Sequence, residues 1–396
     1  MTQKSKLVLK PCIVCGSLDF DQTSLGNLLA DASDFTNKDE KQSLFLYELT
    51  TCLTCNHSSI QTDNPCWMPT RKHDFIKYGE PSEHYSQISE KLKTLNLVFD
   101  DVSIHTFSYK DFKLANFIAS ELIIPSLELN DFAGCSGNWL PSGSDSISEP
   151  KALTSFISEI RESKKSNKIV LITRFFDHVH NRDLLQTILK LSSPSTHLVF
   201  DLNDYDRLFE LDTLEFVWNE RRNFFRQNDL ASLLTRASVK FSMFTYESNA
   251  VSPTLTGVIS SRLPSDTNSD AAILTRSKNL HLGKKLLALR QDWKLELKLG
   301  HKLAIIGASH KGISLAQFVL ESETNYSLHD DKEALKGKTP PVIPPLGFHS
   351  VSGFDFSEYT HLAITTTLII AEKIIPKLRE SGFKGRILNF DCRSFD

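Results

Sequence analysis

Two short cysteine pairs near the start of the sequence constrain this chain most. Cys12 and Cys15 form one C-x-x-C pair, Cys52 and Cys55 form a second, and 36 residues separate the two pairs. Each pair places two sulfur atoms about one metal ion apart, and the intervening loop returns the chain to complete a tetrahedral shell. The spacing therefore predicts a Zn²⁺ site with these four cysteines as ligands. Two disulfides, or chance spacing, are the alternative interpretation.

The predicted site is structural, because four thiolate ligands leave no open coordination position for water or substrate. The loop between the pairs is longer than the about 15–20 residues usual for such sites, so it should carry structure of its own. Cys66, Cys135 and Cys392 lie outside the pairs and bring the total to an odd number. Free thiols beside a metal-type quartet are typical of a reducing compartment.

Length and composition bound the class of protein. A chain of 396 residues is too long for one ordinary core and predicts two or three domains. Its formal net charge of −3 shows no basic excess, which argues against a nucleic-acid partner. The segment Met1–Lys6 lacks the apolar run of a signal peptide, and the run Leu362–Ile375 is interrupted by Thr and Glu. We therefore expect a cytoplasmic protein with no membrane contact.

The pattern of apolar and polar residues predicts an α/β fold with three units in sequence. An N-terminal zinc-binding module covers residues 1–75, and the strand pattern Leu44–Thr51 delivers its second cysteine pair. A central unit covers residues 76–275, and a smaller C-terminal unit covers residues 276–396. Strands alternate with helical stretches in both later units, which favours parallel sheets with crossover helices.

The central unit is expected to contain helices at 89–97, 109–122 and 184–191, and strands at 122–129, 168–173, 197–202 and 240–246. The C-terminal unit is expected to begin with a charged helix at 279–298 and to form a small Rossmann-like fold. Its expected elements are strands starting at Lys302, Tyr326, His361 and Arg386, with helices at 313–320 and about 370–381.

Motifs in all three units carry a resemblance to a known family. These are Cys12–Gly16 with Cys52–His57, Arg174–Asn181 with Trp218–Phe225, and Ile306–Gly312. Over nearly its whole length, the chain resembles the sugar C-methyltransferases that modify nucleotide-linked deoxysugars. The family has an N-terminal zinc module, a central class I S-adenosylmethionine domain with a Rossmann fold, and a Rossmann-like C-terminal domain. The resemblance implies that order of domains here.

The resemblance also implies residues for binding S-adenosylmethionine. Glu128 corresponds to the acidic residue that the family has at the end of a strand. Glu149 lies in the segment that resembles the family's ribose-binding turn, and Arg174 is the first residue of the next matching motif. Gly134 and Gly137 stand for the glycine loop that lets the backbone approach the cofactor. The family's G-x-G is absent, however, and the cofactor half is shortened. The alternative for Gly134 and Gly137 is an ordinary surface turn.

Catalytic residues follow from the same central motifs. C-methylation next to a carbonyl needs a base for a carbon-bound proton and a group that stabilises the enolate. The resemblance implies His178, or the nearby His180, as base. It also implies Glu220 and Arg221 in the second motif and Tyr78 in an aromatic segment. Arg221 replaces a family histidine, and since arginine stays protonated it can hold an enolate or phosphate but cannot act as base. Alternatively, His178 caps or packs at a strand end.

The C-terminal turn supplies the implied substrate-binding residues Ser309, Lys311 and Gly312. A strand–turn–helix segment with a lysine can hold a phosphate, using N–H groups at the start of the helix. A close-packed structural turn is the alternative. The leading hypothesis is thus a zinc-containing, S-adenosylmethionine-dependent C-methyltransferase acting on a nucleotide-linked sugar or similar metabolite. The competing hypothesis is a catalytically inactive relative that binds a metabolite or a protein partner.

Overall fold

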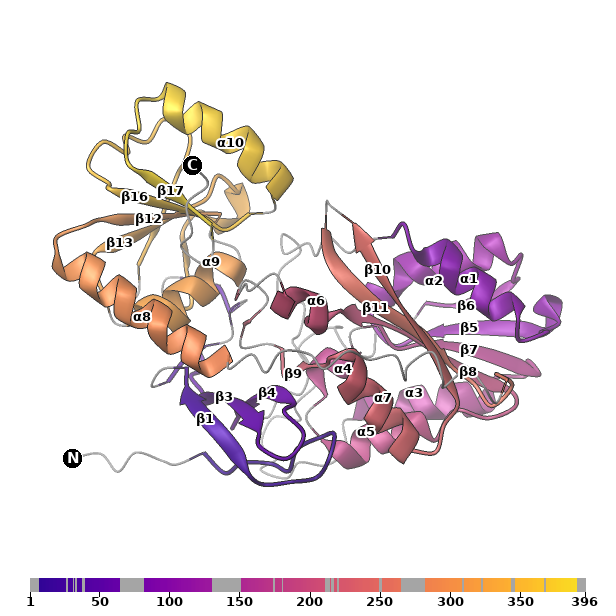
Figure 1. Cartoon of the computed structure of the whole chain (residues 1–396). Helices are drawn as coiled ribbons and strands as arrows, with labels where there is room; N and C mark the ends of the chain where they lie inside the picture. Colours follow the sequence, from indigo (N-terminus) through magenta and orange to yellow (C-terminus); the bar gives the residue numbers. More distant parts are fainter. Residues whose placement is uncertain are drawn as a thin grey trace.

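The computed structural model describes residues 7–25, 28–30, 32, 34–37, 40–64, 82–129, 151–173, 175–179, 181–210, 214, 217–218, 221–248, 251–264, 282–307, 310–321, 323–342, 346–366 and 368–389. These residues form an α/β structure built around separate sheets (Figure 1). Within the described residues, no helix is both long enough and apolar enough to cross a membrane.

The N-terminal sheet is antiparallel and takes its last strand from the central part of the chain. Its order is β1-β3-β4-β9. These strands are β1 (Phe20–Ser24), β3 (Tyr47–Cys52), β4 (Ser58–Thr62) and β9 (Asn223–Phe224). The pairing of Ser58 with Phe224 joins the cysteine-bearing segment to a motif more than 160 residues later. The N-terminal segment is therefore continuous with the central unit through backbone hydrogen bonds.

The central sheet has the order β10-β11-β8-β7-β5-β6. Its strands are β5 (Val102–Thr106), β6 (Ser126–Glu128), β7 (Asn167–Leu171), β8 (Thr196–Asn203), β10 (Phe241–Ser248) and β11 (Val251–Ile259). β6, β5, β7 and β8 run parallel, whereas β11 is antiparallel to both β8 and β10. The expectation of a parallel sheet holds for β5, β6, β7 and β8 and for β10, which runs in the same direction as β8, and it is wrong for β11.

Helices cover both faces of the central sheet (Figure 1). The helices of the central unit are α1 (Tyr85–Lys93), α2 (Phe112–Glu121), α3 (Lys151–Glu162), α4 (Phe175–His178), α5 (Arg182–Leu189), α6 (Tyr205–Glu210) and α7 (Gln227–Arg236), with short 3₁₀ turns at Phe99–Asp101 and Tyr109–Asp111. One core packs α1 and α2 against inward residues such as Ile104 and Ile169, and the other packs α3, α5 and α7 against Val170 and Phe200. The sheet is buried on both faces, as expected of parallel strands joined by crossover helices.

The C-terminal unit is a parallel sheet in the order β15-β13-β12-β16-β17. Its elements are α8 (Leu282–Lys298), β12 (Leu303–Ile306), α9 (His310–Leu315), a π-helix (Ala316–Leu320), β13 (Tyr326–His329), a 3₁₀ turn (Glu333–Leu335), β14 (Lys338–Thr339), β15 (Phe348–His349), β16 (His361–Ile364), α10 (Leu368–Glu380) and β17 (Arg386–Leu388). The elements expected from the sequence in this unit are confirmed. β14 leaves this sheet and pairs with β2 (Thr36–Asn37) of the N-terminal segment.

One apolar core joins all three parts of the chain. It contains Tyr47 and Leu49 from the N-terminal segment, Tyr205 from the central unit, and Leu303 and Phe318 from the C-terminal unit. A second core includes the cysteine pairs themselves, as described below. Because burial of apolar surface stabilises by roughly 25 cal/mol per Å², the parts depend on one another for stability.

Buried histidines predict a loss of stability in acid. Burial lowers the pKa of His197 to about 4, helped by the charge of Arg262, and burial also lowers the pKa of His329 to about 4. Below pH 6.5 the unfolded chain binds protons at these positions and the folded chain does not, so stability falls as the pH drops from 6.5 towards 4. Urea unfolding of His197→Gln across this range should show a pH slope flatter by up to about 1.4 kcal/mol per pH unit. An unchanged slope would contradict the assignment.

Candidate metal centre and adjoining site

The two cysteine pairs have the same local backbone geometry. In the first, Gly16 N–H donates to the Cys12 carbonyl at 2.8 Å, and in the second, Asn56 N–H donates to the Cys52 carbonyl at 2.8 Å. Gly16 and Asn56 both have positive φ, at 82° and 62°, a region that glycine and asparagine tolerate best. Each turn therefore points two sulfur atoms to the same side of the chain.

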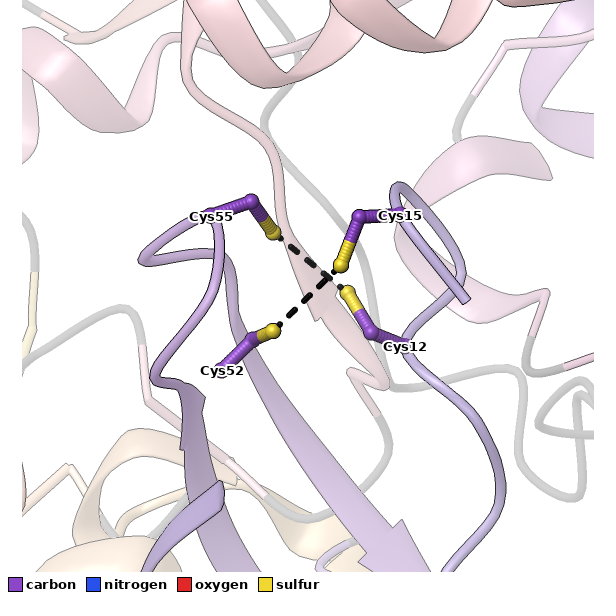
Figure 2. Close-up of side chains that lie close together, drawn as sticks. All are labelled: Cys12, Cys15, Cys52 and Cys55. Atoms are coloured by element: carbon purple, nitrogen blue, oxygen red, sulfur yellow. Dashed lines mark hydrogen bonds between the residues drawn. The ribbon is translucent and has the colours of Figure 1, made fainter. Parts of the chain in front are cut away.

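The four sulfur atoms converge, as Figure 2 shows. Cys12 Sγ lies 3.6 Å from Cys55 Sγ, Cys15 Sγ lies 3.5 Å from Cys52 Sγ, and the four all lie within 4.8 Å of one another. A tetrahedron with Zn–S distances of 2.3 Å has sulfur–sulfur edges of about 3.8 Å. All four cysteines are free thiols, so they are not disulfides. The donor set fits Zn²⁺, and four thiolates would leave it closed to substrate.

The cysteine pairs pack against the core of the central unit. Cys12, Ile13 and Cys52 pack in one apolar cluster with Phe176 and Phe225. Cys12 and Cys52 are 2 % and 0 % exposed. Cys15 and Cys55 are only partly buried, so the four cysteines lie at the edge of this core.

A buried polar network ties the second cysteine pair to α7. His57 Nδ1 lies 3.2 Å from Asp229 Oδ2, and Arg226 Nη2 donates to Asp229 Oδ1 at 2.9 Å. The Arg226 guanidinium also donates to the Cys55 carbonyl at 3.4 Å. His57, Arg226 and Asp229 are all buried, so this network positions the loop after the metal ligands.

The two central motifs identified in the sequence lie together. Arg222 N–H donates to the Asp177 carbonyl at 2.7 Å, and the Asn223 side-chain amide donates to the Phe176 carbonyl at 2.9 Å. The predicted base His178 ends α4, directly beyond the carboxyl end of β7, and is 2 % exposed. Its proposed role stays a prediction.

Arg221 lies at the junction of the central and C-terminal units. Its guanidinium lies 3.6 Å from the centre of the Trp218 ring and donates to the Tyr205 hydroxyl at 2.8 Å. On the other side of the junction, the His310 ring at the start of α9 lies 4.6 Å from the Trp218 ring. Trp218 thus joins the predicted enolate- or phosphate-binding arginine to the C-terminal turn that carries Lys311.

Four cationic side chains act on His310 at this junction. Burial lowers the pKa of His310 well below its usual range, and the charges of Lys311, Arg221, Lys110 and Lys332 lower it further. Lys110 and Arg221 come from the central unit, whereas Lys311 and Lys332 come from the C-terminal unit. Cations from two units of the chain therefore act on one buried imidazole.

Gly312 permits close packing of the C-terminal turn. A Cβ atom there would lie 3.0 Å from the Gly307 carbonyl oxygen and 3.0 Å from Thr365 Oγ1. Thr365 Oγ1 also donates to the Gly307 carbonyl at 2.7 Å. α9 therefore lies close against the carboxyl ends of β12 and β16, with Lys311 in its first turn.

Glu128 ends the edge strand β6 and is exposed. β6 is the second strand of the central parallel sheet, since it pairs with β5 and follows it in sequence. The turn at the switch point of this sheet is instead Phe107–Asp111, which directly follows β5 and contains no glycine. The other predicted site residues lie outside the described residues: Tyr78, Gly134, Gly137, Glu149, Arg174, His180, Glu220 and Ser309.

Three residues near these sites were not identified from the sequence. They are Asp111, Trp218 as the link across the junction, and His310. Asp111 is fully buried, and its carboxylate accepts backbone hydrogen bonds from the ends of both β5 and β7. An acid at the first turn of a helix is a common capping signal, so its role at the strand ends depends on the fold.

Comparison with known proteins gives little further information. No protein family model matches the chain, and no curated protein matches it. Among solved structures, it shows similarity to the crystal structure of the S-adenosylmethionine-dependent methyltransferase SibL in its apo form. That similarity has a TM-score of 0.22 and 12% sequence identity, and it covers 40% of this chain and 42% of that chain. The match spans less than half of either protein and is too weak to assign a fold or function.

Proposed function

We propose that this chain is a methyltransferase-like protein, held together by one structural zinc ion, that binds an anionic small metabolite where its central and C-terminal units meet. The main support is the set of cations around His310, to which both units contribute. Clustered cations raise the local concentration of an oppositely charged ligand and strengthen its binding. A nucleoside diphosphate, as in a nucleotide-linked sugar, has the matching charge.

Arg221 and Trp218 suit such a ligand. The guanidinium presents donors in a planar fork that matches phosphate geometry, and its stacking on Trp218 together with the bond to Tyr205 fixes its orientation. Lys311 adds a point charge from the first turn of α9. The proposed site therefore needs both units in place.

Calorimetric titration of the full chain with thymidine or uridine diphosphate tests this proposal. Lys332→Glu should weaken binding by about five- to tenfold at low salt, because it reverses one charge of the set. Lys336→Glu is the matched control: Lys336 is an exposed lysine of the same segment that pairs with Glu333 and is not among the cations acting on His310. Equal effects of the two substitutions, or no binding at millimolar ligand, would contradict the proposal.

Methyl transfer is the second candidate function. It is favoured by Glu128, which ends the second parallel strand, and by Asp177 and His178, which follow β7. The turn after β5 disfavours it, because this turn contains no glycine to let the backbone approach a cofactor closely. Titration with S-adenosylhomocysteine separates the two candidates: binding below the millimolar range would support methyl transfer, and its absence would support a binding protein.

A further inference from the structure

The topological switch point of the central sheet lies between β5 and β7. β6 lies on one side of β5 and β7 lies on the other, so the chain leaves the sheet in opposite directions at these two strands. In open α/β sheets, ligands bind beyond the carboxyl ends of the strands at this position. Backbone N–H groups exposed there attract anionic groups.

The carboxylate of Asp111 takes up those N–H groups. Its Oδ2 accepts from Phe107 N–H at 2.8 Å and from Ser108 N–H at 2.7 Å, and its Oδ1 accepts from Thr173 N–H at 2.8 Å. The first two donors follow β5 and the third follows β7. The side chain is 0 % exposed. One carboxylate therefore bridges the ends of the two strands that define the switch point.

Asp111 makes no capping bond to the N–H groups of α2 itself, although it is the N-cap residue of that helix. An aspartate at this position ordinarily accepts from the helix N–H two or three residues later. The carboxylate instead turns back towards the strand ends. Its bond from Ser108 N–H matches one half of a capping box for the helical segment that begins with the 3₁₀ turn Tyr109–Asp111.

Two further hydroxyls belong to the same turn region. Ser108 Oγ and Thr173 Oγ1 are buried and have no hydrogen-bond partner among the described residues. Buried hydroxyls without partners are uncommon because each costs free energy. Besides the N–H groups that bond to Asp111, the strand ends thus carry two hydroxyl groups that could bond to a ligand. Such extra polar groups are expected at a site that binds a polar ligand.

We propose that an anion-binding site lies at this switch point and that the carboxylate of Asp111, a residue of the chain itself, occupies it. This carboxylate makes the hydrogen bonds that the carboxylate of a bound molecule would otherwise make. The side chain thereby blocks the site in the folded protein. Removal of the side chain exposes a pocket of backbone donors that binds a small monocarboxylate. This inference concerns the central sheet alone and does not depend on a ligand at the junction.

Chemical rescue of Asp111→Ala tests the proposal in the full chain. The variant should unfold several degrees below the wild type, and sodium formate or acetate should restore much of that loss. Sodium chloride at the same ionic strength should not, and the wild type should not respond to formate. Asp101→Ala removes a half-buried acid that lies just before β5 and accepts from Ser166 N–H, and this variant should show no formate-specific effect. Equal effects of formate and chloride on Asp111→Ala would overturn the proposal.

Asp111→Asn keeps the volume of the side chain and provides a second measurement if the alanine variant does not fold. The amide has a single acceptor oxygen, so it cannot serve Thr173 and the Phe107–Ser108 pair together. Amide hydrogen exchange should accelerate at Thr173 or at the pair, and formate should not reverse it because the amide still fills the position. Unchanged exchange at all three amides would likewise overturn the proposal.

Discussion

Chelation of the metal is expected to unfold the central unit as well as the N-terminal segment. The cysteine pairs pack in the same core as Phe176 and Phe225, and β4 pairs with β9. Structural zinc sites contribute of the order of 10 kcal/mol of apparent binding free energy, which is comparable to the whole stability of an ordinary domain. Loss of the metal should therefore remove the cooperative unfolding transition of both parts together.

Circular dichroism and tryptophan fluorescence during chelation would measure this effect. Cys52→Ser should reproduce it, because a serine hydroxyl does not replace a thiolate as a zinc ligand at this buried position. Cys135→Ser makes the same chemical change outside the cysteine pairs and should retain one zinc ion per chain. If chelation changes only the spectroscopic signals of the N-terminal segment, the prediction is contradicted. The core that the cysteine pairs share with Phe176 and Phe225 would then contribute too little to the stability of the central unit.

Asp229→Ala is expected to destabilise the protein by about 3–5 kcal/mol. The substitution leaves the Arg226 guanidinium buried without its bidentate partner, and breaking one side of a buried ion pair typically costs that much. It also removes the carboxylate that holds His57. Zinc affinity should fall as well, since His57 and the Arg226 bond to the Cys55 carbonyl position the second cysteine pair.

Urea unfolding and competition with a chromophoric chelator would measure the two effects. Glu210→Ala provides the control, because it breaks the exposed pair between Arg207 and Glu210 and should cost no more than about 1 kcal/mol. A loss of stability in Asp229→Ala with unchanged zinc affinity would show that the network supports the fold but does not position the metal ligands.

The cluster of four cysteines could be predicted from the sequence because its determinants are local. Two C-x-x-C pairs identify four candidate ligands without knowledge of the surrounding structure. The glycine or asparagine that follows each pair permits the turn. The core into which the pairs pack could not be predicted, since it depends on Phe176 and Phe225 from the central unit. The strand pairing of Ser58 with Phe224 is equally non-local.

The first strand of the central sheet was missed for a physical reason. β5 alternates apolar with polar residues, so it lacks the continuous apolar pattern of a buried parallel strand. Its polar side chains are buried nevertheless, because Ser103 Oγ and His105 Nε2 lie 2.8 Å apart and His105 Nδ1 lies 3.3 Å from Glu159. Mutual hydrogen bonding makes such a strand compatible with burial.

The missing strand also explains why the turn at the switch point was not found from the sequence. Without β5, the glycines at 134 and 137 were the natural candidates for a cofactor loop, although the sheet turns at Phe107–Asp111. The junction could not be derived either, because Trp218 and His310 meet only through the packing of two units. A site whose residues lie close together in short sequence motifs can be predicted from the sequence. A site whose residues come from distant elements can be found only when the fold is known.

X-ray absorption spectroscopy at the zinc edge tests the central claim most directly. The account predicts one zinc ion per chain surrounded by four sulfur atoms at about 2.3 Å. A shell containing nitrogen or oxygen ligands would contradict it. So would protein that holds no zinc and contains a Cys12–Cys55 or Cys15–Cys52 disulfide.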